Sequence, residues 1–168
     1  SVVYVTGGAG FTGRHVVQAL VTAGESCRCL VRDPDSAREE LPDGVDLVAG
    51  RLKDGDSVPG LEGSEVVVSV SPIAACAPLV EACRQKRVDR AVFVSSTWAL
   101  SSRRTPEGDA VVAGESVVEA SGLSWTILRP TMIYGPGDKN VSRLRALIRR
   151  RRCVPIAGSG VASVQPVF

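Results

Sequence analysis

Three glycines near the start of the chain have the spacing of a loop that binds phosphate groups. Gly7, Gly10 and Gly13 follow an apolar, β-branched run and precede an apolar pattern with helical spacing. In such a strand, turn and helix, the first glycine permits the tight turn and the second lets the backbone approach a pyrophosphate. The third allows the helix to pack closely on the strand. The start of the helix then directs N–H groups and its positive dipole end at the phosphates. An ordinary glycine-rich turn is the alternative, but the flanking pattern favours a dinucleotide-binding unit.

A charged pair lies about 20 residues beyond the glycines, where a dinucleotide fold contacts the adenosine ribose. Arg32 and Asp33 end a short apolar run at residues 27–31. An acid at this place binds the 2′-hydroxyl of NAD, whereas an arginine accommodates the 2′-phosphate of NADP. Arg32 therefore favours NADP, and Asp33 keeps NAD as the alternative. Both side chains could instead be loop residues whose charges face solvent.

Hydroxyl groups gather at Ser95, Ser96 and Thr97, directly after a buried strand expected at residues 90–94. Open α/β sheets bind ligands at the carboxyl ends of their strands, so these hydroxyls are candidates for substrate contacts. Capping of backbone groups is the alternative role. The only histidine, His15, lies among apolar residues of the first helix, which excludes Ser-His-Asp hydrolysis. No cluster has metal-ligand spacing, so no metal site is expected.

The elements that would position these residues alternate between strands and helices. After the first helix, which should end at Gly24, we expect strands at residues 27–31, 45–48, 66–70, 90–94 and 125–128, and helices at 36–40, 75–87, 109–120 and 141–150. This alternation predicts an α/β fold with a doubly wound parallel sheet. We expect a dinucleotide-binding domain at residues 1–130. Residues 131–168 would begin an incomplete C-terminal substrate-binding portion packed on the same domain, with a short strand at 154–156 and a loop at 158–160.

Composition narrows the class of protein. The 168 residues are 44% hydrophobic and carry a formal charge of +2, which fits a globular protein and gives no reason to expect nucleic-acid binding. The basic run at 149–152 follows a helical pattern and reads as a solvated helix end. Five cysteines without metal spacing favour reduced thiols. With no leader and no run of about 18 apolar residues, we expect a cytoplasmic protein without a membrane span; a homo-oligomer is compatible with the sequence.

Four motifs together resemble the short-chain dehydrogenase/reductase superfamily, in its extended and atypical branches. Residues 6–13 resemble the Thr-Gly-x-x-Gly-x-x-Gly fingerprint, residues 93–97 the end-of-strand-five signature, residues 121–130 the sixth-strand signature, and residues 134–137 the Tyr-Gly-Pro-Gly element. The branches include nucleotide-sugar epimerases and NADP-binding regulators of the nitrogen-metabolite-repression type. The resemblance spans essentially the whole chain and implies a Rossmann fold with NADP, or alternatively NAD, as cofactor.

The chain departs from the family where catalysis is expected. The resemblance places Thr97 at the hydroxyl that polarises the substrate oxygen, but it places Glu107 where the family has its acid/base tyrosine. Val111 then stands where the family has the accompanying lysine. Without that phenol, no residue of the usual type is present to transfer the proton. Glu107 is then either a different acid/base or a solvated carboxylate at the start of a helix. The resemblance also places Arg51 where the family commonly has an aspartate near the adenine amino group, and an arginine cannot accept that hydrogen bond. Arg51 could instead stack on the adenine or reach a phosphate.

Two functions follow from the sequence. The first is an NAD(P)-dependent, epimerase/dehydratase-like or reductase-like enzyme acting on a small-molecule substrate, with Thr97 and Glu107 as catalytic candidates. The second is a non-catalytic NADP-binding sensor or regulatory interaction protein. In both cases the residues expected to bind the nicotinamide dinucleotide are Thr6, Gly7, Gly10, Phe11, Thr12, Gly13, Arg32, Arg51, Ser71, Ser95 and Pro130.

Overall fold

The structure is a computed structural model that describes residues 1–53, 57–102, 104–138 and 140–151, together with residues 159, 161, 163 and 165–168. The chain divides into two compact units, Ser1–Arg129 and Pro130–Phe168. The first unit contains the sheet and four of the α-helices. The second contains the Tyr-Gly-Pro-Gly segment and one helix.

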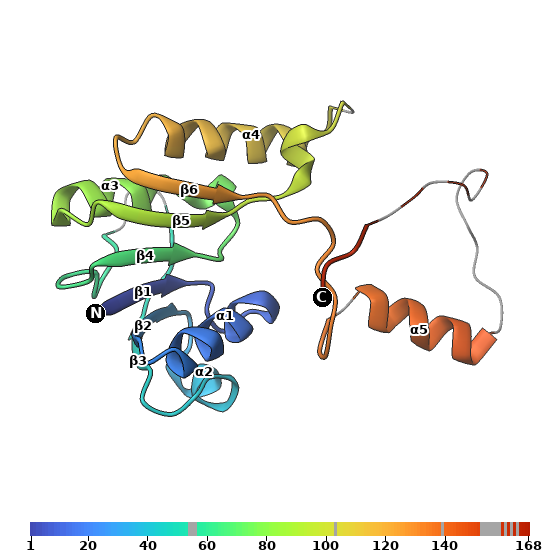
Figure 1. Cartoon of the computed structure of the whole chain (residues 1–168), viewed down its shortest axis with the longest axis horizontal. Coiled ribbons are helices and arrows are strands. Elements are labelled where there is room, and N and C mark those ends of the chain that lie inside the picture. Colours follow the sequence, from blue (N-terminus) through green and yellow to red (C-terminus); the bar gives the residue numbers. More distant parts are fainter. Residues whose placement is uncertain are drawn as a thin grey trace. The chain divides into compact units, whose positions relative to one another are not determined.

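A six-stranded parallel sheet forms the centre of the first unit (Figure 1). Its strands are β1 (Val2–Thr6), β2 (Ser26–Val31), β3 (Asp46–Ala49), β4 (Val66–Ser69), β5 (Arg90–Val94) and β6 (Ser124–Leu128), in the order β3-β2-β1-β4-β5-β6. The chain runs outward from β1 to β3 and then returns to place β4 on the other side of β1. This order confirms the predicted doubly wound α/β fold and puts the reversal of strand order between β1 and β4.

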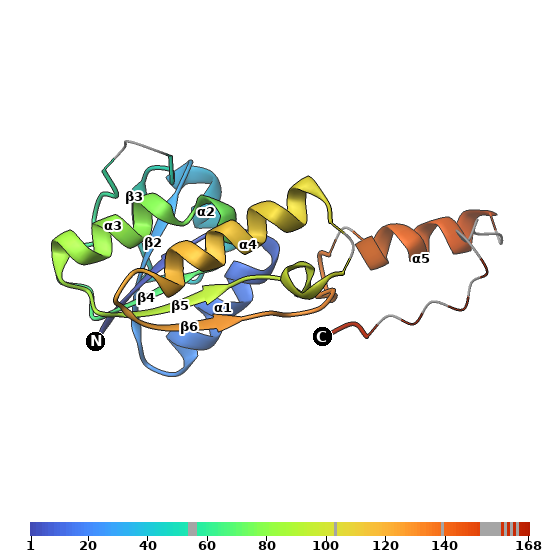
Figure 2. The ribbon, with the colours of Figure 1, turned by 90° about the horizontal axis from the view of Figure 1, so that it is seen from above.

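Helices cover both faces of this sheet, as the two perpendicular views show (Figures 1 and 2). Helices α1 (Phe11–Thr22) and α2 (Pro34–Glu40) lie on one face, and α3 (Ala77–Lys86) and α4 (Pro106–Glu119) lie on the other. Successive strand residues point to opposite faces, so Val3 and Val5 pack in the α1/α2 layer while Tyr4 packs in the α3/α4 layer. Burial on both faces explains why the central strands are almost continuously apolar.

Two helices begin at places that the apolar periodicity did not predict. Helix α4 starts at Pro106 rather than near residue 109, because Thr105 caps it by accepting a hydrogen bond from the Gly108 N–H at 3.1 Å. The helix expected at residues 75–87 is a 3₁₀ turn, η1 (Ile73–Ala75), followed by α3. Helix α3 ends at Arg87, whose left-handed backbone (φ 58°) closes it.

The buried cysteines act as small apolar residues of the core. Cys27, Cys29, Cys76 and Cys83 are buried and free, which agrees with the expected reduced thiols; Cys153 lies outside the described residues. Burial raises the pKa of the Cys76 thiol to about 11, and that of Cys29 to about 12. At neutral pH these groups stay protonated, so they are poor nucleophiles.

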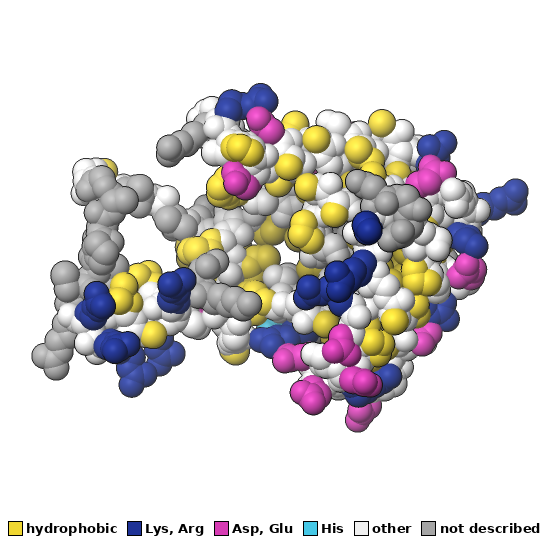
Figure 3. All heavy atoms as spheres, turned by 180° about the vertical axis from the view of Figure 1, so that it is seen from behind, with side chains coloured by type: hydrophobic (Ala, Val, Ile, Leu, Met, Phe, Trp, Pro, Cys, Tyr) yellow, Lys and Arg dark blue, Asp and Glu magenta, His cyan; other side chains and the backbone are white. Residues whose placement is uncertain are grey.

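The second unit is held by contacts between its two ends. A parallel bridge joins Ile133 to Val167, and the Tyr134 and Phe168 rings meet edge to face with centroids 5.4 Å apart. Helix α5 (Asn140–Arg151) exposes Leu144 and Ile148 beside basic side chains, which Figure 3 shows as yellow and dark blue atoms on that helix. The strand expected at 154–156 lies outside the described residues, as does most of the loop at 158–160. Among the described helices, none is both long and apolar enough to cross a membrane.

Candidate functional site

The turn after β1 depends on two glycines that lie against other backbone. Gly7 has a φ of +72°, and a Cβ there would lie 2.7 Å from the Ser71 nitrogen. At Gly13 a Cβ would lie 1.9 Å from the Gly7 carbonyl oxygen, far inside van der Waals contact. The first and third glycines are therefore required by the approach of the turn to β4 and by the packing of α1 onto the turn.

The N-terminus of α1 presents its N–H groups without a protein cap. Gly10 is the residue before the helix, it has no side chain to cap it, and no acidic residue lies in the first turn. The first N–H groups of any α-helix lack partners within the helix, and they carry the positive end of its dipole. Phe11 and Thr12 begin this helix. The geometry is that of an anion-binding helix start.

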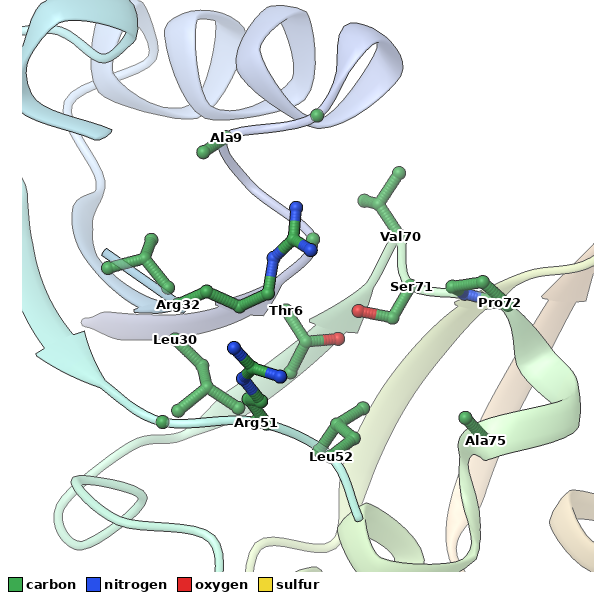
Figure 4. Close-up of a pocket in the computed structure, with 14 residues that line it drawn as sticks. Thr6, Ala9, Leu30, Arg32, Arg51, Leu52, Val70, Ser71, Pro72 and Ala75 are labelled. Carbon is green, nitrogen blue, oxygen red and sulfur yellow. The ribbon is translucent and has the colours of Figure 1, made fainter. Parts of the chain in front are cut away.

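A cavity of about 480 Å³ lies at the carboxyl ends of the central strands (Figure 4). Such a volume fits a small ligand or part of a dinucleotide. It is lined by Thr6, Gly7, Ala9, Gly10, Leu30, Val31, Arg32, Gly50, Arg51, Leu52, Val70, Ser71, Pro72 and Ala75. It therefore spans the reversal of strand order between β1 and β4, where ligands bind in folds of this class.

Six of the sequence-predicted residues line this cavity. They are Thr6, Gly7, Gly10, Arg32, Arg51 and Ser71. The Thr6 hydroxyl is buried and lies 3.0 Å from the Ser69 hydroxyl, which links the carboxyl ends of β1 and β4. Sequence reasoning missed the other lining residues. Leu30, Val31 and Val70 could have been found from their places at strand ends, but Ala75 comes from the η1 turn, which the periodicity did not show.

The charged pair after β2 separates into two environments. Arg32 lines the cavity, and its guanidinium reaches into it in Figure 4. The Asp33 carboxylate instead caps α2 and accepts hydrogen bonds from the N–H groups of Asp35, at 3.1 Å, and Ser36, at 3.4 Å. From sequence position alone, both residues were candidates for contact with the adenosine ribose of the cofactor.

The hydroxyl-rich segment after β5 is fixed by a buried carboxylate. Ser95 donates a 2.5 Å hydrogen bond to Glu115 of α4, and Arg129 binds the same carboxylate through Nε at 2.9 Å and a terminal nitrogen at 2.7 Å. These hydrogen bonds, above all the one from Arg129, hold the pKa of Glu115 below its usual value although burial opposes them. The three residues tie α4 to the ends of β5 and β6.

Thr97 lies in a second cavity, apart from the glycine loop. That cavity, of about 520 Å³, is lined by Thr97, Trp98, Ser101 and Thr105. Glu107 lies in the first turn of α4, is exposed and does not line it. Val111 packs against the apolar core, so the position of the family lysine is filled by a core side chain.

The remaining predicted residues lie outside both cavities. Phe11, Thr12 and Gly13 form the first turn of α1, the Ser95 hydroxyl is engaged by Glu115, and Pro130 opens the second unit. Within the residues that the structure describes, no group of three His, Cys, Asp or Glu side chains could hold a metal ion.

Neither cavity of the first unit has a tyrosine phenol at hand. Tyr4 is buried and donates to the Pro59 carbonyl at 2.7 Å, and burial raises its pKa well above the usual value. Tyr134 belongs to the second unit.

Comparison with known proteins identifies the family of the chain. A family model described as NAD(P)H-binding matches residues 7–151. The chain is 33% identical over 172 residues to the ceramide reductase of Caulobacter vibrioides, covering 92% of this chain and 53% of that protein. It is 30% identical over 134 residues to the NAD(P)H azoreductase of Xenophilus azovorans, covering 76% of this chain and 47% of that protein. The chain thus spans about half the length of these curated relatives.

Among solved structures, an NAD-dependent NDP-hexosamine 5,6-dehydratase of tunicamycin biosynthesis superposes with a TM-score of 0.78 at 23% identity, covering 95% of this chain and 65% of that one. This likeness shows the fold. The family match covers the glycine loop, all of α5 and every lining residue of the two cavities except Thr6. The chain therefore belongs to the NAD(P)H-binding family, and its fold is that of NAD-dependent dehydratase and epimerase structures.

Proposed function

We propose that this chain is the cofactor-binding part of an NADP-dependent reductase that acts on a small carbonyl compound. The observation that carries the proposal is the cavity at the β1/β4 reversal, which joins the glycine turn and the uncapped start of α1 to the guanidinium of Arg32. When bound, NADPH supplies a hydride to the substrate. The similarity to two reductases, a ceramide reductase and an NAD(P)H azoreductase, supports reductase chemistry over a purely regulatory role.

The preference for NADP over NAD rests on the two side chains after β2. An acid that binds the ribose 2′-hydroxyl of NAD has to face the cavity. Asp33 is occupied as the cap of α2, whereas Arg32 lines the cavity and carries the positive charge that a 2′-phosphate requires. Arg32 is thus the residue we assign to cofactor selectivity.

Replacing Arg32 by alanine should weaken NADPH binding by about ten- to a hundred-fold and leave NADH binding nearly unchanged, because a hydrogen bond to a charged group contributes about 1.5–3 kcal/mol. Titration of each cofactor, followed by the fluorescence of the half-exposed Trp98, measures both affinities. Arg84→Ala, which removes an exposed arginine of α3, is the control. A wild-type protein that prefers NADH would contradict the assignment, and binding of neither cofactor would refute the proposal as a whole.

For the chemical step we propose that the Thr97 hydroxyl donates a hydrogen bond to the substrate carbonyl. Thr97 follows β5 at the ligand-binding edge of the sheet and lines the second cavity beside Trp98. Glu107 is the remaining candidate for proton transfer. It is exposed in the first turn of α4 and does not line the cavity that holds Thr97, so it is the weaker candidate of the two.

Thr97→Ala should lower carbonyl-dependent oxidation of NADPH by about a hundred-fold, as expected for loss of a group that acts in proton or hydrogen-bond catalysis. Glu107→Gln, which keeps size and polarity, should change the rate by less than about three-fold if the carboxylate is only a solvated helix-start charge. The measurement is the absorbance of NADPH with a panel of ketones and aldehydes. NADPH binding without turnover of any carbonyl would favour the non-catalytic sensor instead.

A further inference from the structure

Two arginines from neighbouring strands reach the same part of the cavity. Strands β2 and β3 pair in parallel, and the Gly50 N–H donates to the Val31 carbonyl at 2.8 Å. The register pairs Val31 with Ala49, which puts Gly50 opposite Arg32 and Arg51 one residue further along. Arg32 and Arg51 therefore leave the same end of this strand pair, although 19 positions separate them in the sequence. Figure 4 shows both guanidinium groups extending into the space in front of Thr6 and Ser71.

Among the residues that the structure describes, neither guanidinium has an anionic partner. The described lining of the cavity contains no carboxylate, and no hydrogen bond or ion pair joins a described residue to either guanidinium. Three nearby acids have other partners: Asp33 caps α2, Asp46 pairs with Arg28, and Glu40 pairs with Arg14.

We propose that Arg51 is the second guanidinium of a phosphate-monoester site and binds the 2′-phosphate of NADP together with Arg32. A 2′-phosphate carries close to two negative charges at neutral pH, which matches two converging guanidinium groups. Arg51 can only donate hydrogen bonds, so it cannot act as the acceptor for an adenine amino group. The diphosphate has a separate site at the glycine turn and the start of α1, which leaves both arginines for the 2′-phosphate. This inference rests on the proposed binding of NADP.

The test uses adenosine 2′,5′-bisphosphate, which carries the 2′-phosphate without nicotinamide, and ADP, which lacks it. Calorimetry should show that Arg51→Ala weakens the bisphosphate by about ten- to a hundred-fold and ADP by less than about three-fold. Lys53→Ala is the matched control: it removes an exposed positive charge two residues further on that does not line the cavity, and it should change neither affinity by more than about two-fold. Arg51→Lys should bind the bisphosphate more tightly than Arg51→Ala but less tightly than wild type, because lysine keeps the positive charge but cannot donate two parallel hydrogen bonds as a guanidinium does.

Each outcome decides the inference. Selective loss of the bisphosphate in Arg51→Ala supports the two-arginine site. An equal loss of both ligands would overturn it, because Arg51 would then contact the shared nucleotide, and so would an Arg51→Ala protein that binds the bisphosphate as tightly as wild type. If wild type binds NADPH but Arg51→Ala has no effect, only this inference fails. If wild type binds neither NADPH nor NADH, the proposed function fails with it.

Discussion

The Gly13→Ala variant is expected to lose about 3 kcal/mol or more of its free energy of unfolding, and with it the ordered glycine turn. The added methyl would lie 1.9 Å from the Gly7 carbonyl oxygen, 2.7 Å from the Gly7 carbonyl carbon and 2.8 Å from the Gly8 Cα. All three atoms belong to backbone, so no side chain can rotate away. To relieve this clash, α1 would have to move away from β1, which would open the apolar layer around Val17. Urea unfolding followed by circular dichroism measures the loss.

Gly10→Ala is the matched control for this prediction. A Cβ at Gly10 would meet only the Gly7 carbonyl oxygen, at 3.2 Å, which a small adjustment relieves. Because Gly10 lines the cavity, the methyl instead takes space that we assign to the diphosphate. We expect a stability within about 1 kcal/mol of wild type and an NADPH affinity at least about ten-fold weaker. If the Gly13→Ala protein were as stable as Gly10→Ala, α1 would not pack against the Gly7 backbone as closely as we describe.

The second large effect is expected at Glu115. Its side chain is only 7% exposed and accepts hydrogen bonds from Ser95 and Arg129. Glu115→Ala removes the acceptor for both and leaves the Ser95 hydroxyl buried without its partner. We expect the free energy of unfolding to fall by about 3 kcal/mol. This is the lower end for a broken buried ion pair, because Arg129 is 36% exposed and water can replace part of its contact. The urea midpoint of unfolding measures it.

Glu119→Ala is the control for Glu115→Ala. Glu119 is a carboxylate on the same helix, one turn further on, and it is exposed, so its removal should change stability by less than about 0.5 kcal/mol. Equal losses in the two variants would mean that the buried network does not stabilise the ends of β5 and β6. Since Ser95 is two residues before Thr97, Glu115→Ala should also lower turnover by displacing Thr97.

The same network gives a pH dependence with a defined sign. The folded protein holds the pKa of Glu115 below its unfolded value, chiefly through Arg129, so the folded state binds a proton here more weakly than the unfolded state. The stabilisation is complete above the unfolded pKa of about 4.3 and is lost as pH falls through the lower folded pKa. The stability gap between wild type and Glu115→Gln should therefore be largest at neutral pH and should shrink as the pH is lowered through this range. A constant gap would contradict it.

Sequence patterns were most informative where the physical cause is local. Apolar β-branched runs placed β5 at its exact bounds and the other strands within one or two residues, because burial on both faces of a parallel sheet selects such runs. The glycine turn was also readable, because Gly13 packs against Gly7, only six residues earlier, although the contact of Gly7 with Ser71 is distant in sequence. The start of α4 was misjudged because Thr105 and Pro106 act through capping, which leaves no apolar periodicity.

By itself, then, the sequence determined the order of strands and helices, the glycine turn and the arginine after β2, since these follow from steric and burial preferences of neighbouring residues. Only the tertiary structure decided which side chains meet. It turned Asp33 toward α2 and Arg32 toward the cavity, and the pairing of β2 with β3 placed Arg51 on the lining of the same cavity as Arg32. It also joined Glu115 to Arg129 across two elements. Such contacts depend on strand register and on packing between distant segments, and neither leaves a local signal in the sequence.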